Sequence, residues 1–392
     1  MKELEDIVAA FEKVASSGKM AALATVVKVK GSTYRKPGAR MLMTRDNPIV
    51  GSISGGCLES DVFEQAQRII DSGEPLLVNY DTTSDEDISW GLGLGCKGMV
   101  HVLIEPLETL QPTLVQVGEQ ELNPIVFIKE CFRRRQLGML ATVFAIEGEI
   151  QAKLGNHLML HSDNTVITDI QDKELVTGIL NEAAAVLNNS KSKVIVYPLS
   201  TGSAEVLLEA IAPPVPLLIF GAGSDVVPVV RLAKALGWHV TVVDTRSNNA
   251  TSDGFPLANN FINCRAENVG DRIPVDSHTV AVVMTHNYLH DLELLKTFLP
   301  SQLQYLGLLG PKRRTEQLLQ DLQAEGITPN VETLNSTSLR SKLYAPIGLD
   351  IGGDTPEAIA LAIISEIQAV LNNRSGGFLR DRHAPIHQRP DE

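Results

Sequence analysis

An internal repeat constrains the fold of this chain more than any other feature of its sequence. The segment ATVV at 24–27 recurs as ATVF at 141–144, an offset of 117 residues (141 − 24). The same offset maps Gly38 onto Gly155, and the later segments LLVNY (76–80) and VIVY (194–197) also match. Each copy has the pattern helix, strand, turn, strand, helix. We therefore predict an N-terminal α+β domain, residues 1–212, built from two degenerate units of about 1–110 and 111–212.

The two copies differ most where the first contains cysteine. GSISGGCLESD at 51–61 has no counterpart, because the second copy has TDIQDKEL at 168–175. The segment GLGLGCKG at 91–98 is also missing from the second copy. We infer that the second copy is structural and that the first carries the chemistry.

The second half of the chain has a different pattern. After the proline-rich connector APPVP (212–216), four short apolar segments alternate with amphipathic stretches: LLIF (217–220), VTVV (240–243), VAVVM (280–284) and YLGLL (305–309). This alternation predicts a Rossmann-like, doubly wound parallel sheet over 213–375, so the fold class is α/β. The polar segment 376–392 is expected to be a loose tail.

Charge and cysteine content exclude several classes of protein. The net charge of −13 argues against a nucleic-acid or anionic-membrane binder, because both need a positive surface. No apolar run reaches the ~20 residues that a membrane helix requires. Four cysteines without regular pairing fit a reducing compartment, and the acidic start lacks the features of a signal peptide. We expect a cytoplasmic protein.

Cys57 is the first candidate for chemistry. Apolar residues at helical spacing follow it, so we expect it at a helix N-terminus, where the helix dipole and free amides favour a thiolate. Gly55 and Gly56 would let a bulky ligand approach the backbone. Cys96 also lies among glycines, and the two thiols are candidate ligands of a soft metal centre. The alternative is a small buried residue in a tight turn. The spacing matches no zinc or iron–sulfur framework.

A basic loop and several strand ends complete the candidate residues. In GSTYRKPGARM (31–41), Arg35 and Arg40 could hold a phosphate or carboxylate, unless the loop is only a solvated hairpin tip. Gly221, Gly223 and Asp244 form most of a dinucleotide fingerprint, although Val226 replaces its third glycine. Close packing of a strand on a helix would also explain these glycines. At later strand ends, where such sheets bind ligands, the candidates are His286, Gly310 and Asp350.

With these motifs in view, the chain resembles the XdhC/CoxI family, the xanthine dehydrogenase accessory factors. The matching segments are GSTYRKPGARM, GSISGGCLES, LGLGCKG, LLIFGAG, VVDTR, MTHN, YLGLLGPKRR and YAPIGLDIGGDTPEAIA, in order along both halves. Two positions depart from the family pattern. Ser224 stands where histidine is common, and Lys97 stands where glycine is common after the second cysteine.

The resemblance implies a non-catalytic carrier of the molybdenum cofactor (molybdopterin). Such proteins hold the cofactor during sulfuration, with a cysteine desulfurase as partner, and deliver it to an apo molybdenum hydroxylase such as xanthine dehydrogenase. Gly55, Gly56, Cys57 and Cys96 would then bind the cofactor. A crevice in the second domain would be lined by Gly221, Gly223, Asp244, His286, Gly310 and Asp350. Self-association into a homo-oligomer is also expected from the family. Two alternatives stay open: an NAD(P)- or nucleotide-dependent oxidoreductase using the second domain, and an interaction scaffold with vestigial sites.

Overall fold

The computed structural model describes residues 2–31, 33–81, 98–107, 122–189, 192–246, 252–327 and 342–383. These residues form two compact units, and the chain passes from the first to the second after Pro213. The first unit is α+β and the second contains a six-stranded parallel sheet. The predicted fold class is therefore confirmed.

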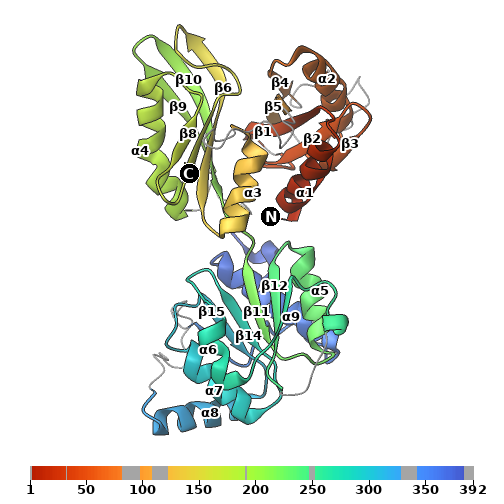
Figure 1. The fold of residues 1–392 in the computed structure, drawn as a ribbon, viewed down its shortest axis with the longest axis vertical. Coiled ribbons are helices and arrows are strands. Elements are labelled where there is room, and N and C mark those ends of the chain that lie inside the picture. Colours follow the sequence, from red (N-terminus) through yellow and green to blue (C-terminus); the bar gives the residue numbers. More distant parts are fainter. Residues whose placement is uncertain are drawn as a thin grey trace. The chain divides into compact units, whose positions relative to one another are not determined.

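The two halves of the first unit have the same order of elements (Figure 1). The first repeat comprises α1 (Lys2–Ser16), β1 (Ala21–Gly31), β2 (Arg40–Thr44), β3 (Pro48–Gly51), α2 (Glu59–Ser72), β4 (Leu76–Asp81) and β5 (Gly98–Leu107). The second comprises α3 (Pro124–Arg134), β6 (Gly138–Gly148), β7 (His157–His161), β8 (Val166–Thr168), α4 (Lys173–Asn189), β9 (Lys193–Leu199) and β10 (Gly202–Ile211).

The strand orders confirm the predicted repeat. The sheets run β3-β2-β1-β5-β4 and β8-β7-β6-β10-β9, so each strand has a counterpart in the same place. Strands β1 and β6 begin 117 residues apart, whereas β5 and β10 begin 104 apart. The difference arises between the last two strands, which are joined by residues 82–97 in the first repeat and by 200–201 in the second.

The two repeats share a core. On one face of each sheet, α2 or α4 packs on its own strands. On the other face, α1 and α3 contribute to one apolar cluster together with strands of both sheets, and Figure 1 shows these two helices side by side. A second shared cluster joins Val27 and Leu103 of the first repeat to Phe144 and Leu207 of the second. Burial of these surfaces, at roughly 25 cal/mol per Å² of apolar area, holds the repeats together.

The second unit alternates strands and helices. Its elements are β11 (Pro216–Phe220), α5 (Val226–Ala235), β12 (His239–Asp244), β13 (Asn260–Asn263), α6 (Val269–Arg272), β14 (Val280–Val283), α7 (Tyr288–Phe298), β15 (Tyr305–Leu308), α8 (Lys312–Ala324), β16 (Leu343–Tyr344) and α9 (Pro356–Leu371). The strand order is β13-β12-β11-β14-β15-β16, with every pair parallel. Helices α5 and α9 pack on one face and α6, α7 and α8 on the other.

The strands and helices of the second unit form where local sequence signals predict them. All four apolar segments are strands. Thr355 caps α9, because its Oγ1 accepts the amide of Ala358 at 3.2 Å. The strand order reverses direction between β11 and β14, which is where sheets of this type bind ligands.

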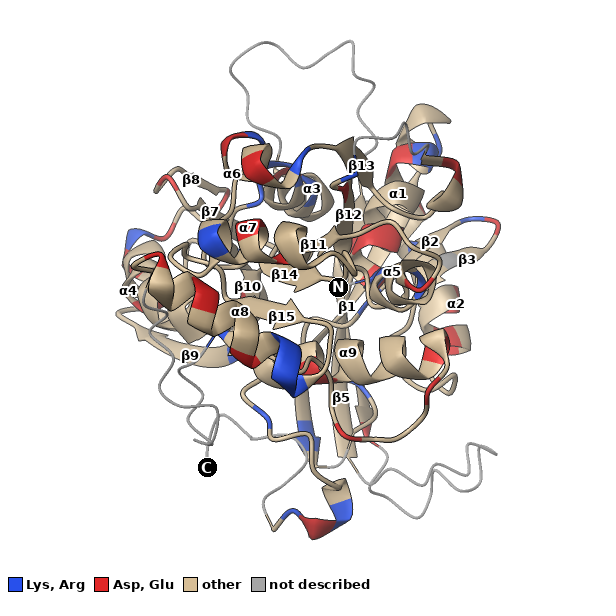
Figure 2. Cartoon of the chain, turned by 90° about the horizontal axis from the view of Figure 1, so that it is seen from below, with Lys and Arg blue, Asp and Glu red and all other residues tan. Residues whose placement is uncertain are grey.

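Two findings bear on the predicted surface. No helix among the described residues is long and apolar enough to cross a membrane. Acidic and basic residues are interspersed along the described helices rather than gathered on one of them (Figure 2).

Candidate functional site

Arg40 joins the two repeats. It is 2% exposed, and it donates from Nη1 to Oε1 of Glu209 at 3.0 Å and from Nη2 to Oε2 of the same residue. Gly38 makes room for this pair, since a Cβ at that position would collide with Oε1 of Glu209. The guanidinium also donates to the carbonyl of Gly38. The observed partner of Arg40 is therefore a buried carboxylate of the other repeat.

The second repeat makes the equivalent contact with a different residue. His157 is the counterpart of Arg40 at the offset of 117, and its Nε2 lies 2.8 Å from Oε1 of Glu105, the counterpart of Glu209. Gly155 stands where Gly38 stands, with its Cβ position 3.3 Å from the same Glu105 oxygen. Burial lowers the pKa of His157, but the charge and hydrogen bond of Glu105 outweigh it and raise the pKa.

The segment from Ser52 to Glu59, here called the Gly-Cys loop, has its own hydrogen-bond framework. Oγ of Ser54 accepts the amides of Gly56, Cys57 and Leu58 at 3.1–3.2 Å. Glu59 accepts the amide of Ser54 at 2.9 Å, and it also accepts the hydroxyls of Ser52 and Ser54. Burial raises the pKa of Glu59, but these hydrogen bonds outweigh it and the net pKa is lowered. An ionised Glu59 thus fixes the loop.

Comparison with the second repeat shows what is special about this loop. Ile53 and Leu58 correspond to Ile170 and Leu175, and all four are buried, so the ends of the loop are fixed alike. Between them the second repeat continues straight into α4 at Lys173, whose equivalent in the first repeat is residue 56. Helix α2 begins only at Glu59. The first repeat therefore leaves three residues outside its helix, where the second has helix.

Cys57 lies in this non-helical turn. We predicted it at the helix N-terminus, and the structure places it two residues before α2, with its own amide bonded to Ser54. Cys57 is a free cysteine, and the residue is partly exposed. Gly56 has a φ of 109°, and none of the described residues comes within 4 Å of its Cβ position or covers the loop there. The described residues contain no cluster of three metal-binding side chains. Cys96 lies outside the described residues, so its role as a second ligand of the cofactor and its metal stays a prediction.

The basic loop at 33–39 meets the Gly-Cys loop. Arg35 forms an ion pair with Glu3 of α1, and Glu3 also accepts the amide of Ser52 at 3.3 Å. The ring of Tyr34 lies against Gly55, with three ring atoms 3.7–3.8 Å from the Cβ position. Our sequence reasoning missed both Tyr34 and Glu59. The signal for Tyr34 was available, because an aromatic residue stood in a loop otherwise made of small and charged residues.

In the second unit the glycine turn follows β11. Gly221 has a φ of 128°, and a Cβ there would collide with the carbonyl of Met284 at the end of β14. The carboxylate of Asp225 lies beside Gly223 in space, and it is 2.7 Å from Nε2 of His286. A carboxylate beside the turn is unfavourable for the pyrophosphate of a dinucleotide. The glycine at 221 is thus explained by packing between neighbouring strands.

Asp244 is placed as the fingerprint predicts, at the end of β12, but it already has a partner. It is 1% exposed, and Arg246 donates to it from the backbone amide, Nε and Nη2 at 2.9–3.0 Å. Burial raises the pKa of Asp244, whereas the hydrogen bonds and charge of Arg246 outweigh it and lower the pKa. Arg246 also donates to the carbonyl of Ala222 in the glycine turn.

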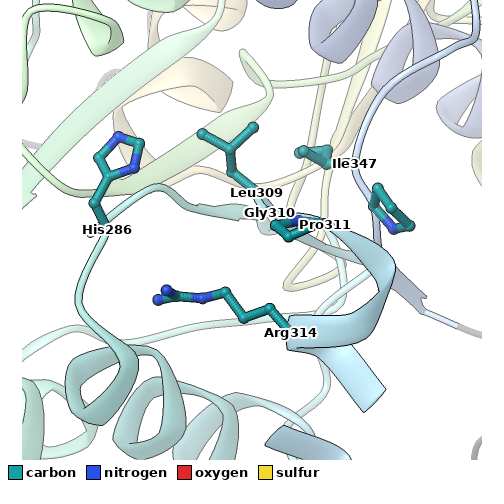
Figure 3. A pocket seen from close by; sticks show the side chains of 7 residues that line it. His286, Leu309, Gly310, Pro311, Arg314 and Ile347 are labelled. Atoms are coloured by element: carbon teal, nitrogen blue, oxygen red, sulfur yellow. The ribbon is translucent and has the colours of Figure 1, made fainter. Parts of the chain in front are cut away.

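A cavity of about 330 Å³ opens at the ends of β14 and β15 (Figure 3). His286 and Gly310 both line it, and Arg314 extends from α8 toward the loop that carries His286. The rest of the wall is apolar and is formed by Leu309, Pro311, Pro346 and Ile347. Arg314 is held by buried Asp291 and lies over the ring of Tyr288. Asp350 is exposed on the next loop and is not among the lining residues.

The chain therefore offers two sites of different chemistry. The Gly-Cys loop presents one thiol, a backbone that no other described residue covers at Gly56, and the exposed ring of Tyr34, which together suit a large ligand with a soft atom. The second unit presents a small, mostly apolar cavity with one guanidinium and one imidazole, which suits a compact ligand with a polar edge.

Both halves of the chain match models of known protein families. Residues 14–81 match the model of the XdhC and CoxI family, and residues 217–367 match that of the XdhC Rossmann domain. A crystal structure of a xanthine dehydrogenase from Bacillus halodurans is 27% identical, covers 94% of this chain and 96% of that one, and gives a TM-score of 0.71.

Two curated relatives cover nearly the whole chain. The molybdenum cofactor insertion chaperone PaoD of Escherichia coli is 21% identical over 90% of this chain and 84% of its own. A probable xanthine dehydrogenase subunit from Bacillus subtilis is 31% identical over 88% of this chain and 92% of its own. At that identity and coverage, with both family models matched in order, this protein belongs to the XdhC and CoxI family.

Proposed function

We propose that this protein binds the molybdenum cofactor at the Gly-Cys loop and delivers it to an apo molybdenum hydroxylase of the xanthine dehydrogenase type. One observation carries the proposal: the two repeats share their framework and differ at this loop, where the first places a partly exposed cysteine and the second continues its helix. The Escherichia coli relative is named a molybdenum cofactor insertion chaperone, which is the same role, and the Bacillus subtilis relative is named a probable subunit of xanthine dehydrogenase, the type of hydroxylase proposed as recipient.

The residues present fit such a cargo. The molybdenum cofactor is a bulky anionic pterin with a dithiolene and a soft metal centre, and thiolate sulfur is a suitable ligand for soft metals. Among the described residues nothing fills the space beside Gly56, which leaves room for a large group next to Cys57. The serine and glutamate framework positions the loop without using the thiol.

The proposal is tested by measuring molybdenum and pterin on protein purified from cells that make the cofactor. Wild type is compared with Cys57→Ser and with Cys131→Ser, a change at a buried thiol of the shared core. We expect bound cofactor in wild type and Cys131→Ser and at least a tenfold loss in Cys57→Ser. Equal loading of all three proteins would contradict a role for Cys57.

The proposal also includes sulfuration of the bound cofactor and self-association of the protein. We propose that a terminal sulfur is installed while the cofactor is held, with a cysteine desulfurase as donor, and that the protein self-associates. Sulfuration is tested by counting cyanide-releasable sulfur per molybdenum in the carrier before and after incubation with a desulfurase and cysteine. An unchanged count would remove this step from the proposal.

Sedimentation of the purified chain tests self-association, and a strictly monomeric mass would count against it.

A second candidate is nucleotide binding by the second unit. It is favoured by the glycine turn that follows β11 at the point where the strand order reverses. It is disfavoured by the carboxylate of Asp225 at that turn and by Arg246, which occupies both oxygens of Asp244. Calorimetric titration with NAD and NADP decides: saturable binding that Asp244→Ala weakens supports the candidate, and no heat of binding removes it.

A further inference from the structure

Tyr34 is an exposed aromatic side chain that the framework of the first repeat does not use. It is 72% exposed, although tyrosine buries part of its ring in most positions. It is absent from the apolar clusters of the first unit. Leaving such a ring in water forgoes the stabilisation that burial would provide.

The ring nevertheless has a defined place. Three of its carbon atoms lie at nearly equal distances, 3.7–3.8 Å, from the Cβ position of Gly55, so the face of the ring and not its edge rests on the loop. The loop that carries Tyr34 is fixed on the other side, because Arg35 pairs with Glu3, which also accepts the amide of Ser52. Tyr34 is thus held against the Gly-Cys loop at a glycine that stands two positions before Cys57.

The second repeat of the same chain can be compared with the first at the position of Tyr34. At the offset of 117, the framework residues Gly38 and Gly155 are identical, and the pair formed by Arg40 is formed again by His157. Tyr34 instead corresponds to Gln151, just as Cys57 corresponds to Glu174. The ring and the thiol therefore occur together in the first repeat and are both missing from the second.

We propose that the ring of Tyr34 is a stacking platform for the conjugated bicyclic ring of the pterin, next to the thiol of Cys57. The inference rests on the proposed function and adds a binding residue to it. Aromatic side chains bind planar heterocycles through their faces, at about 1–3 kcal/mol per stacked ring in nucleic-acid complexes. Gly55 leaves the loop without a side chain that would displace the ring.

The test uses the full chain and two probes. The first is the molybdenum cofactor released from a donor protein, and the second is pterin-6-carboxylate, which has the ring but neither dithiolene nor metal. Dissociation constants are measured by equilibrium dialysis for wild type, Tyr34→Phe, Tyr34→Ala and Tyr34→Gln, the last being the residue of the second repeat. Phe378→Ala, which removes another exposed ring (69% exposed), is the matched control.

We expect Tyr34→Ala and Tyr34→Gln to weaken binding of both probes by roughly 5- to 150-fold, as loss of one stacked ring predicts. Tyr34→Phe and Phe378→Ala should bind like wild type, and Cys57→Ser should lose affinity for the metal-bearing probe alone. Wild-type affinity in Tyr34→Ala, or equal losses in Tyr34→Phe and Tyr34→Ala, would overturn stacking while the proposed function stands. No binding of the molybdenum cofactor by wild type would instead overturn the proposed function itself.

Discussion

Arg40 and His157 occupy the same position in the two repeats, and each bonds to the glutamate of the other repeat. The result is a pair of crossed contacts, Arg40 to Glu209 and His157 to Glu105, related by the internal symmetry of the first unit. Both contacts are buried, so each charge depends on its partner. The two contacts differ in one respect: only the histidine can lose its charge near neutral pH.

Arg40→Ala should destabilise the first unit severely. The change leaves Glu209 buried without its partner, and breaking a buried pair in this way costs about 3–5 kcal/mol. Urea denaturation followed by circular dichroism measures the loss. Arg45→Ala is the control, because the pair of Arg45 with Asp71 is more than half exposed and should contribute less than about 1 kcal/mol. Equal losses in the two variants would show that the contact between the repeats is not a main source of stability.

His157 should make the stability of the first unit depend on pH. Its folded-state pKa is raised above the ordinary value of 6.5, so the protonated form stabilises the fold. This contribution is complete below about pH 6.5 and is lost as the pH rises through the folded-state pKa. The free energy of unfolding, measured from pH 5.5 to 9, should therefore fall in wild type more than in His157→Gln.

His157→Arg is the sharper variant for the same question. It installs the residue that the first repeat uses, and Gly155 leaves space beside Glu105 as Gly38 does beside Glu209. Since arginine stays charged at all accessible pH values, the fold should persist and the pH dependence assigned to this site should vanish. A slope identical to that of wild type would assign the pH dependence to other groups.

The fold was predictable from sequence because it depends on periodic patterns. The offset between ATVV and ATVF identified the repeat, and alternating apolar segments identified the parallel sheet of the second unit. Thr355 before Pro356 marked the start of a helix, because its capping interaction is local. Such signals lie within a few residues of one another, so one sequence is enough to find them.

The site was less predictable because its contacts are long-range. Nothing near Arg40 in the sequence indicates Glu209, which lies 169 positions away. We therefore placed Arg40 in a loop and interpreted it as a ligand-binding group, whereas the structure places it at the start of β2 and bonded to the other repeat. Asp244 was identified correctly as a strand-end acid, but its pairing with Arg246 depends on side-chain geometry that composition does not reveal.

Gly221→Ala should destabilise the second unit whether or not any nucleotide binds. A Cβ there would meet the carbonyl of Met284, and the φ of 128° is strained for any other residue by about 1–3 kcal/mol. Fluorescence of buried Trp238, in a Trp90→Phe background, reports unfolding of this unit. Gly254→Ala is the control, because no described residue comes within 4 Å of its Cβ position. Unchanged stability in Gly221→Ala would contradict the packing explanation and favour a role of this glycine in ligand binding.

Glu59→Gln should loosen the Gly-Cys loop while helix α2 persists. The carboxylate accepts hydrogen bonds from Ser52 and Ser54, and hydrogen bonds to charged groups contribute about 1.5–3 kcal/mol each. Because the pKa of Glu59 is lowered below 4.5, wild type keeps this stabilisation at neutral pH and loses it as the pH falls through the folded-state pKa.

Hydrogen–deuterium exchange of the peptide that spans 51–58 measures the effect of Glu59→Gln directly. At pH 7 the amides bonded to Ser54 should exchange faster in Glu59→Gln than in wild type, whereas Glu64→Gln, a change at an exposed position of α2, should leave them unchanged. If the loop carries the cofactor, Glu59→Gln should also reduce molybdenum loading although Cys57 is intact. Faster exchange with undiminished loading would show that the loop needs no fixed conformation to bind its cargo.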